Sequence, residues 1–242
     1  MRVALVETDT VWEDPGANRR RMARLSLDAD VAVFPELSFS GFTMNPLPDP
    51  EAEPFLISLA RDKNMSLVAG YIGDGPTNVA AAVCPDEGIV ARYRKMHPFS
   101  HAGEHKAYRP GDDLPLFDLH GFSAAMLICY DLRFPEAFRE AALRGANLFF
   151  VPANWPAARA THWRALLVAR AIENQAFVIG VNRIGSDPDV EYAGGSLVVD
   201  PAGEILHEGS GVDSIAPESA TTLRREFPAL DDVRRDRYGW IR

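Results

Sequence analysis

The stretch AMLICYDLRFPE, residues 125–136, places a cysteine at the boundary between an apolar run and a group of charged residues. Met126, Leu127 and Ile128 are typical of a buried strand, whereas the residues after Cys129 include several charged side chains. In open α/β sheets, ligand sites lie beyond the carboxyl ends of the strands, so the residue that follows such a run is well placed for chemistry. Cys129 is therefore either a packed strand residue or a reactive thiol.

Strand-like and helix-like patterns alternate on both sides of this stretch. Asp14 and Pro15 are typical of the N-cap and first turn of a helix that carries Met22, Leu25 and Leu27. Apolar runs predict strands, and amphipathic runs predict further helices. The strands are expected over residues 2–8, 30–36, 65–73, 122–129, 147–154 and 176–183, the helices over 50–64, 135–146 and 160–175, and two hairpins over 77–95 and 195–209. This alternation predicts a layered α/β fold with mixed sheets faced by helices.

Length and composition favour a single domain over residues 1–242. Of the 242 residues, 47% are hydrophobic and 24% are charged, which is typical of one globular α/β domain. From about residue 212 to residue 242 the sequence is polar and rich in arginine. We expect a C-terminal arm there, which either packs on a partner subunit or frays as a terminus.

Charge and cysteine content exclude several classes of protein. The formal net charge of −9 argues against nucleic acid or an anionic membrane as a partner, because both favour a basic surface. The N-terminal segment is too poor in apolar residues for a signal peptide, and no run approaches the ~18 apolar residues of a membrane-spanning helix. The two cysteines, Cys84 and Cys129, form no disulfide framework and no zinc-ligand spacing. We therefore expect a cytoplasmic protein.

Reactive side chains follow four of the apolar runs. Glu36 follows VAVFP (31–35), and Lys95 follows GIVARYR (88–94). Cys129 follows AMLI (125–128), and Asn154 and Trp155 follow LFFVPA (148–153). A thiol attacks as its thiolate, so Cys129 needs a base, and Glu36 can take its proton. A lysine ammonium and the backbone N–H after the nucleophile, that of Tyr130, would stabilise an oxyanion. Lys95 fits that role.

Each of these residues also has a plain structural interpretation. An isolated strand cysteine is usually a small buried apolar residue, and Cys84 fits that description because no base or cation accompanies it. Glu36 and Lys95, taken alone, are more often a cap, a surface charge or half of an ion pair.

A second cluster lies in KMHPFSHAGEHKAYRPGDD, residues 95–113. His97, His101 and His105 recur every four residues, as metal ligands on one helix would. Proline and glycine within the stretch argue against a continuous helix. We therefore favour a loop that carries Glu104 toward the site, where a second carboxylate can orient the lysine and relay protons.

Five blocks of sequence stand out along the chain. They are PELSFSGF (35–42), YRKMHPF (93–99), GEHKAYRPG (103–111), ICYDLRFPE (128–136) and HWRALLVARAIENQAFVIGVNR (162–183). In this order they resemble the blocks of the nitrilase superfamily of carbon–nitrogen hydrolases. The resemblance extends from about Val3 to Pro228, nearly the whole chain. The resemblance implies an α-β-β-α sandwich that forms a homodimer through its helical faces. It also implies a catalytic triad of Glu36, Lys95 and Cys129, assisted by Glu104.

This resemblance implies covalent acyl transfer without a metal or organic cofactor. Cys129 attacks an amide carbon, ammonia leaves, and water hydrolyses the thioester. The blocks look most like those of bacterial omega-amidases, which act on 2-oxoglutaramate and 2-oxosuccinamate. Within that interpretation the expected contacts to substrate come from six residues. They are Phe42, Met44, Asn154 and Trp155 in the acyl pocket and Arg133 and Arg159 as candidate cations for a carboxylate.

Three other interpretations remain open from the sequence. The same chemistry fits a carbamoylase, a small aliphatic amidase or an amidase of deaminated glutathione. A metal-dependent hydrolase would instead use His97, His101 and His105 with neighbouring acids. A catalytically inactive binding module would have no chemical reason to keep Glu36, Lys95, Glu104 and Cys129 together.

Overall fold

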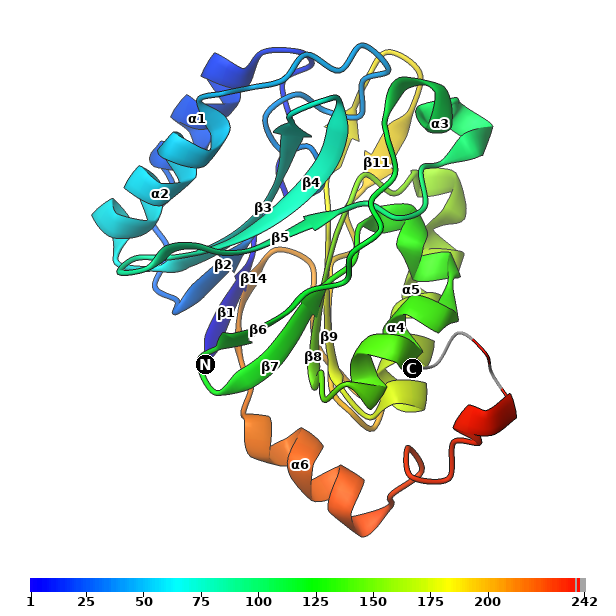
Figure 1. The fold of residues 1–242 in the computed structure, drawn as a ribbon. Coiled ribbons are helices and arrows are strands. Elements are labelled where there is room, and N and C mark those ends of the chain that lie inside the picture. Colours follow the sequence, from blue (N-terminus) through cyan, green and yellow to red (C-terminus); the bar gives the residue numbers. More distant parts are fainter. Residues whose placement is uncertain (238, 240–242) are drawn as a thin grey trace.

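Two six-stranded mixed sheets lie face to face between two layers of helices (Figure 1). The computed structural model describes residues 1–237 and 239. This arrangement confirms the predicted α-β-β-α sandwich. No helix among the described residues is both long enough and apolar enough to cross a membrane.

The first sheet has the strand order β14-β1-β2-β3-β4-β5. Its strands are β1 (Arg2–Leu5), β2 (Val31–Val33), β3 (Ser66–Gly73), β4 (Thr77–Cys84), β5 (Gly88–Arg94) and β14 (Gly211–Ser214). Strands β1 to β3 run parallel, and β4 and β5 form the expected antiparallel hairpin. Helices α1 (Pro15–Ala23) and α2 (Ala52–Lys63) cover its outer face (Figure 1).

Helix α1 begins as predicted but ends early. The Asp14 side chain accepts a hydrogen bond from the Ala17 N–H at 2.8 Å, which satisfies one of the free donors of the first turn. The helix ends at Ala23, so Leu25 and Leu27, which were expected on it, lie beyond its end. Both still pack against the core between α1, α2 and the first sheet.

The second sheet has the order β13-β12-β9-β8-β7-β6. Its strands are β6 (Leu116–Leu119), β7 (Phe122–Met126), β8 (Leu148–Ala153), β9 (Phe177–Asn182), β12 (Leu197–Val199) and β13 (Ile205–Glu208). Helices α4 (Pro135–Leu143) and α5 (Ala160–Asn174) cover its outer face. A separate two-stranded ribbon, β10 (Ile184–Ser186) and β11 (Glu191–Ala193), was not expected from the sequence, and neither was β6.

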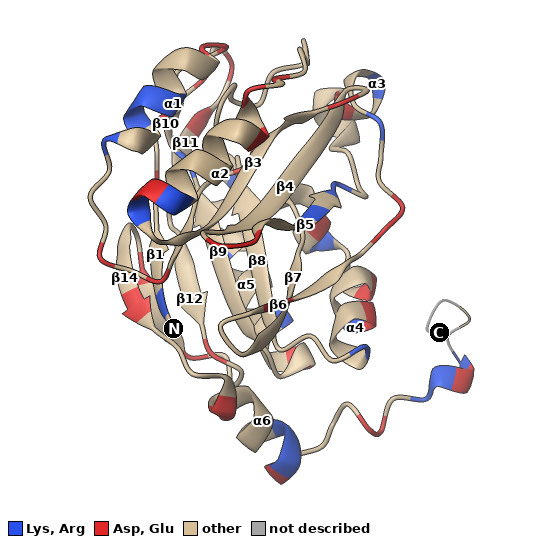
Figure 2. Ribbon diagram, turned by 60° about the vertical axis from the view of Figure 1, so that its left-hand side comes forward, with Lys and Arg blue, Asp and Glu red and all other residues tan. Residues whose placement is uncertain are grey.

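The cores explain why the layers hold together. One cluster of buried apolar side chains fills the space between the sheets and continues under α4 and α5, and another lies between the first sheet and α1 and α2. Strand β4 serves both clusters, because Ala80 and Ala82 face the other sheet while Val79, Ala81 and Val83 face α2. Charged residues lie mainly on the helices and loops outside the sheets (Figure 2).

The C-terminal part of the chain begins inside the first sheet. Strand β14 pairs antiparallel with β1, and Arg2 lies opposite Ser214. The predicted arm therefore starts too early at 212, because residues 212–214 are held by ladder hydrogen bonds. Helix α6 (Pro217–Glu226) follows, and Arg224 donates to the carbonyl oxygens of Asn174 and Gln175 at 3.0 Å. Residues 238 and 240–242 of the predicted arm lie outside the described residues.

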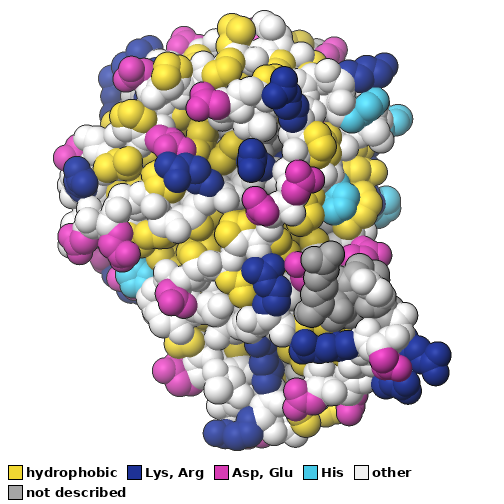
Figure 3. Space-filling model, in the orientation of Figure 1, with side chains coloured by type: hydrophobic (Ala, Val, Ile, Leu, Met, Phe, Trp, Pro, Cys, Tyr) yellow, Lys and Arg dark blue, Asp and Glu magenta, His cyan; other side chains and the backbone are white. Residues whose placement is uncertain are grey.

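Lys and Arg side chains gather around this C-terminal segment at the lower right of the molecule (Figure 3). On the described part of the chain they include Arg224, Arg225, Arg234, Arg235 and Arg237. Residues 217–237 also carry five acidic side chains, so this segment is balanced in charge and the acidic excess of the protein lies elsewhere.

Candidate active site

Glu36, Lys95 and Glu104 meet in the interior, between the two sheets. The Lys95 Nζ donates to Glu36 Oε1 at 2.7 Å and to Glu104 Oε2 and Oε1 at 2.8 and 3.0 Å. No more than 1% of any of the three side chains is exposed. A buried lysine between two carboxylates places three charges where water cannot solvate them, so their mutual attraction must offset a large desolvation cost.

Glu36 is held in the turn that follows β2. The Gly70 carbonyl oxygen accepts from the Ser38 N–H at 2.8 Å, so this turn packs directly on β3. A Cβ at Gly70 would lie 2.5 Å from the Leu37 nitrogen and 2.8 Å from Glu36 Cα. Glycine is therefore required at residue 70 because the backbone of the glutamate occupies that space.

The Glu36 side chain is fixed at both oxygens. Its Oε1 accepts from Lys95 and, at 2.7 Å, from the Asn78 amide, whereas Oε2 accepts from the Asn154 N–H at 2.9 Å. The Asn154 side chain in turn donates to the Glu36 carbonyl oxygen at 2.8 Å. Oε2 accepts one bond and Oε1 two, so Oε2 is the oxygen with more capacity to accept a proton.

Glu104 reaches the site from a short helix rather than from the predicted loop. It is the first residue of α3 (Glu104–Ala107), which follows the 3₁₀ turn η1 (Ser100–Ala102). Gly103 separates the two with a φ of +84°, a conformation that glycine adopts without a steric cost. This break confirms that residues 97–105 form no continuous helix. The Phe99 N–H donates to Glu104 Oε2 and holds the carboxylate against Lys95.

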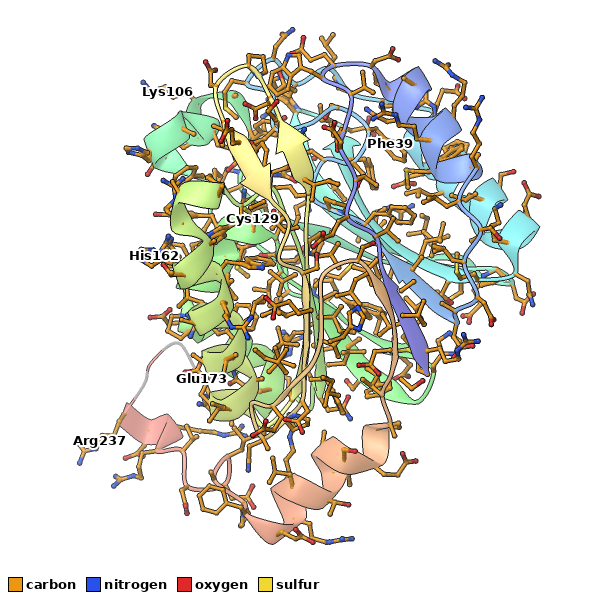
Figure 4. All side chains as sticks on the ribbon, turned by 180° about the vertical axis from the view of Figure 1, so that it is seen from behind. Phe39, Lys106, Cys129, His162, Glu173 and Arg237 are labelled. Carbon is orange, nitrogen blue, oxygen red and sulfur yellow. The ribbon has the colours of Figure 1, made fainter. Side chains whose placement is uncertain are left out.

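Cys129 follows β7 in a strained turn. The strand ends at Met126, earlier than predicted, and Cys129 begins the 3₁₀ turn η2 (Cys129–Arg133) with a φ of +47°. This left-handed conformation is uncommon for a residue with a Cβ and costs of order 1–3 kcal/mol, so the surrounding structure must impose it. Figure 4 shows Cys129 inside the molecule, whereas Lys106, Glu173 and Arg237 lie at its outer edge.

Asp131 supplies much of that constraint. Its fully buried carboxylate accepts from the Ile128 N–H at 2.9 Å and the Tyr93 hydroxyl at 2.8 Å. It also accepts from the His97 N–H at 3.0 Å and contacts His97 Nδ1 at 2.7 Å. Ile128, just before Cys129, and His97, two residues after Lys95, therefore bind the same carboxylate.

The electrostatics of the site keep the thiol protonated and the lysine charged. Burial, together with the nearby Glu36 and Glu104 carboxylates, raises the pKa of the Cys129 thiol well above its ordinary value, although Lys95 acts in the opposite direction. Burial by itself lowers the pKa of Lys95, but Glu104, Glu36 and Cys129 together raise it well above its ordinary value. A thiol in this state would need a base before it could act as a nucleophile.

Cys129 lies at a pocket of about 960 Å³, a size that is typical of small-molecule sites. The predicted substrate contacts Phe42, Met44, Arg133, Asn154, Trp155 and Arg159 all line it, as do Tyr130 and Cys129. The Phe42 ring centroid lies 5.4 Å from Lys95 Nζ, so the same ring borders the pocket and the buried lysine. The lining also includes Asp187 and Asp189, in the turn between β10 and β11, and Glu191 of β11.

The two candidate arginines lie against aromatic rings of the pocket. The Arg133 guanidinium is 4.8 Å from the Trp155 ring centroid, and its Nη2 contacts His162 Nδ1 at 3.3 Å. The Arg159 guanidinium is 5.4 Å from the Phe99 centroid. Such stacking leaves guanidinium N–H groups at the ring edge for a carboxylate.

The three histidines do not converge. His97 bonds Asp131 and stacks on Phe134 with 3.8 Å between ring centroids, whereas His101 lies at the pocket and His105 is exposed. Within the part of the chain that the structure describes, no three His, Cys, Asp or Glu side chains are grouped as a metal site requires.

The sequence did not predict the roles of Asn78 and Asp131, and it predicted a different role for Asn154. Asn154 was expected to contact substrate, but both its N–H groups hold Glu36. Asn78 was detectable as a polar residue two positions before Ala80, on the face of β4 that is otherwise apolar. Cys84 is partly buried and receives a 3.6 Å hydrogen bond from the Ser66 hydroxyl, far from this carboxylate pair in the fold.

A family model of carbon–nitrogen hydrolases matches residues 2–214, the part of the chain that forms both sheets and their covering helices. The chain belongs to the carbon–nitrogen hydrolase family. It is 35% identical over 98% of both chains to a 2-oxoglutaramate amidase of Bacillus subtilis. It is also 36% identical over 96% of both chains to the omega-amidase YafV of Escherichia coli.

A solved structure agrees with this assignment to the carbon–nitrogen hydrolases. It is a superfamily protein of Xanthomonas campestris with an arsenic adduct in its active site, and it matches with a TM-score of 0.90 and 30% identity. The match covers 96% of this chain and 97% of that one. This carbon–nitrogen hydrolase is therefore an enzyme that hydrolyses amide C–N bonds other than peptide bonds, and its substrate is a small-molecule amide.

Proposed function

We propose that this enzyme is an omega-amidase that releases ammonia from 2-oxoglutaramate and 2-oxosuccinamate through a thioester on Cys129. The observation that carries the proposal is one pocket that holds Cys129 and, on its wall, Arg133 and Arg159. A 2-oxo acid amide presents an amide at one end and a carboxylate at the other, and this pocket offers a nucleophile and cations to match. The relatives named as 2-oxoglutaramate amidase and omega-amidase support the same substrate class.

The first half of the reaction acylates the cysteine. Glu36 Oε2 accepts the thiol proton of Cys129 as the sulfur attacks the amide carbon, so a C–S bond forms and the carbonyl oxygen becomes an oxyanion. The Lys95 ammonium and the Tyr130 N–H stabilise that oxyanion. Glu36 then returns the proton to the amide nitrogen, the C–N bond breaks, and ammonia leaves.

The second half hydrolyses the thioester. Glu36 takes a proton from a water molecule as its oxygen attacks the thioester carbon, and the same donors stabilise the second oxyanion. The C–S bond then breaks, the sulfur recovers the proton from Glu36, and the carboxylic acid product departs. Glu104 keeps Lys95 charged and in place through both halves.

Ammonia release from five amides tests this proposal. The amides are 2-oxoglutaramate, 2-oxosuccinamate, glutamine, a carbamoyl amino acid and a short aliphatic amide, each assayed with the wild type, Cys129→Ala and the control Cys84→Ala. We expect turnover of the 2-oxo amides that is lost in Cys129→Ala and kept in Cys84→Ala. Preference for another amide would place the enzyme with the carbamoylases or the aliphatic or deaminated-glutathione amidases, and activity in Cys129→Ala would contradict the mechanism.

We further infer that the enzyme is a single-domain, cytoplasmic homodimer. Two free thiols, Cys84 and Cys129, support a reducing compartment. The resemblance to the family implies pairing through the helical face, and Ile172 of α5 is exposed on that face. Light scattering after size-exclusion chromatography tests the dimer, and an Ile172→Lys variant that elutes unchanged from a wild-type dimer would contradict this interface.

A further inference from the structure

Asn78 joins the two buried glutamates. Its Nδ2 donates to Glu36 Oε1 at 2.7 Å and to Glu104 Oε1 at 2.9 Å. Lys95 Nζ donates to the same two oxygens, at 2.7 and 3.0 Å. Each oxygen therefore accepts one bond from an ammonium and one from a neutral amide.

The register of the β4–β5 hairpin places Asn78 there. Val79 lies opposite Arg94, and the Lys95 N–H donates to the Asn78 carbonyl oxygen at 2.9 Å, so Asn78 and Lys95 face each other across the ladder. Only 1% of Asn78 is exposed. An amide oxygen turned toward two carboxylates would repel both, so the nitrogen must face them. The Asn78 Oδ1 accepts no hydrogen bond from any described residue, so only the donor half of the amide is used.

The charges explain what such a donor does. Two carboxylates share one ammonium, and like charges at this range favour uptake of a proton by one of them. A protonated Glu36 cannot act as a base. Hydrogen bonds to an ionised carboxylate favour its charged form, and an amide supplies them without itself titrating. We propose that Asn78 is a positioning residue that keeps Glu36 and Glu104 ionised together at neutral pH, so that Glu36 is available as the base. This inference rests on the proposed function for the role of Glu36.

The other titratable groups near the two carboxylates are Lys95, Cys129, Tyr108 and Tyr192. Burial, followed by nearby carboxylates, raises the pKa of Tyr108 and of Tyr192 well above their usual range, and the Cys129 and Lys95 pKa values are also raised. All four therefore stay protonated below neutral pH. His97 beside the Cys129 turn and His101 at the pocket are unchanged in every variant, so an acid-side change in rate that occurs only when Asn78 is replaced reports the two carboxylates.

The test compares Asn78→Leu, which removes the donor, and Asn78→Asp, which keeps the shape and replaces the donor by an oxygen. The control is Asn18→Leu, because Asn18 is also buried and its Nδ2 also donates two hydrogen bonds, to the Val11 and Phe39 carbonyl oxygens at 2.8 Å. Two pH profiles are measured: kcat/KM for amide hydrolysis, and the rate of Cys129 alkylation by iodoacetamide with Cys84 replaced by alanine.

We expect the acid limb of both profiles to move to higher pH by about one unit or more in both Asn78 variants. The reason is that both variants lose the N–H donor that favours the ionised carboxylates. The Asn18→Leu limb should coincide with that of the wild type even if its thermal stability falls. Acid limbs that coincide in all variants, with only the amplitude or stability reduced, would overturn the proposal. If no amide is hydrolysed by the wild type, the proposed function fails, but the alkylation profile still decides the role of Asn78.

A measurement on the wild-type sequence keeps the test decisive if both Asn78 variants fail to fold. Infrared spectra at pH 7 of protein with ¹³C-labelled glutamate should show no protonated buried carboxyl that disappears in Glu36→Gln or Glu104→Gln. Such a band in the wild type would mean that one of the two carboxylates already holds a proton, and the inference would be wrong.

Discussion

The Lys95 ammonium donates to Glu36 Oε1 at 2.7 Å, with no more than 1% of either side chain exposed. Removing one partner of such a pair leaves the other charge buried without compensation. We predict that Lys95→Ala abolishes hydrolysis and lowers the free energy of unfolding by about 3–5 kcal/mol, measured by urea denaturation.

The control for Lys95→Ala is Arg92→Ala. Arg92 pairs with Glu53 at the surface, and about half of its side chain is exposed. An exposed ion pair of this kind contributes about 0–1 kcal/mol, so the control should remain close to the wild type. Equal losses in the two variants would contradict the importance assigned to the buried pair.

The raised pKa of Cys129 predicts how stability depends on pH. The folded protein keeps the thiol proton above the ordinary thiol pKa of 9.0, whereas the unfolded chain releases it. The unfolded state then binds fewer protons, so stability must fall as the pH rises above about 9. Chemical denaturation at pH 7 and pH 10 should therefore show a larger loss for the wild type than for Cys129→Ala. A larger loss in the variant would contradict the direction of the shift.

Charge recognition by the pocket predicts an effect on KM. If Arg133 or Arg159 binds the substrate carboxylate, its replacement by alanine should raise the KM for 2-oxoglutaramate about tenfold or more, since a charge-assisted hydrogen bond contributes roughly 1.5–3 kcal/mol. A neutral aliphatic amide should show little change. Arg164→Ala is the control, because Arg164 pairs with Glu208 at the surface. An unchanged KM in both Arg133→Ala and Arg159→Ala would show that neither arginine binds the carboxylate.

Asp131 predicts a coupled loss of stability and rate. Asp131→Asn removes the negative charge that accepts hydrogen bonds from four donors. We expect this variant to lower the free energy of unfolding by about 2–3 kcal/mol. We also expect its kcat to fall with KM nearly unchanged. Steady-state kinetics and thermal unfolding measure both effects. Asp118→Asn, at an exposed position of β6, should behave as the wild type. A normal kcat in Asp131→Asn would mean that the Cys129 turn holds its shape without this carboxylate.

Gly70 predicts a steric effect on the base. An alanine Cβ would lie 2.5 Å from the Leu37 nitrogen, so the Glu36 turn must move. Displacement of a catalytic group by ~1 Å can cost about 10²-fold in rate, and we expect a fall in kcat of that order in Gly70→Ala. Gly16→Ala is the matched control, because Gly16 lies in α1 and alanine favours helix by up to about 1 kcal/mol. Wild-type kcat in Gly70→Ala would contradict the close approach.

Much of this fold was predictable from sequence because strands and helices alternate with strong apolar periodicity. The strands of both sheets, except β6 and β14, coincide with predicted runs, and so do helices α1, α2, α4 and α5, of which α1 and α4 begin at the predicted prolines, Pro15 and Pro135. Strands β10 and β11 of the separate ribbon were not predicted. The short strands were not predicted, and the reason is physical. Strand β14 has alternately half-buried and exposed residues and is recognisable only through its pairing with β1, which is more than 200 residues away.

The site was predictable to the extent that its chemistry lies in recognisable motifs. Glu36, Lys95 and Glu104 do meet, and Cys129 lies at a pocket, as the blocks suggested. Asn78 and Asp131 carry no such motif, and their roles depend on which side chains face each other across separate strands. A local sequence pattern does not contain that information.

The proposed base and the proposed nucleophile belong to opposite sheets, since Glu36 follows β2 and Cys129 follows β7. A chain whose two sheets have not yet docked therefore carries an ordinary thiol and a solvated carboxylate, with no means of activating one by the other. Catalytic competence appears only when the halves of the sandwich close, so the rate of amide hydrolysis during refolding should report the docking event itself rather than the earlier formation of either sheet.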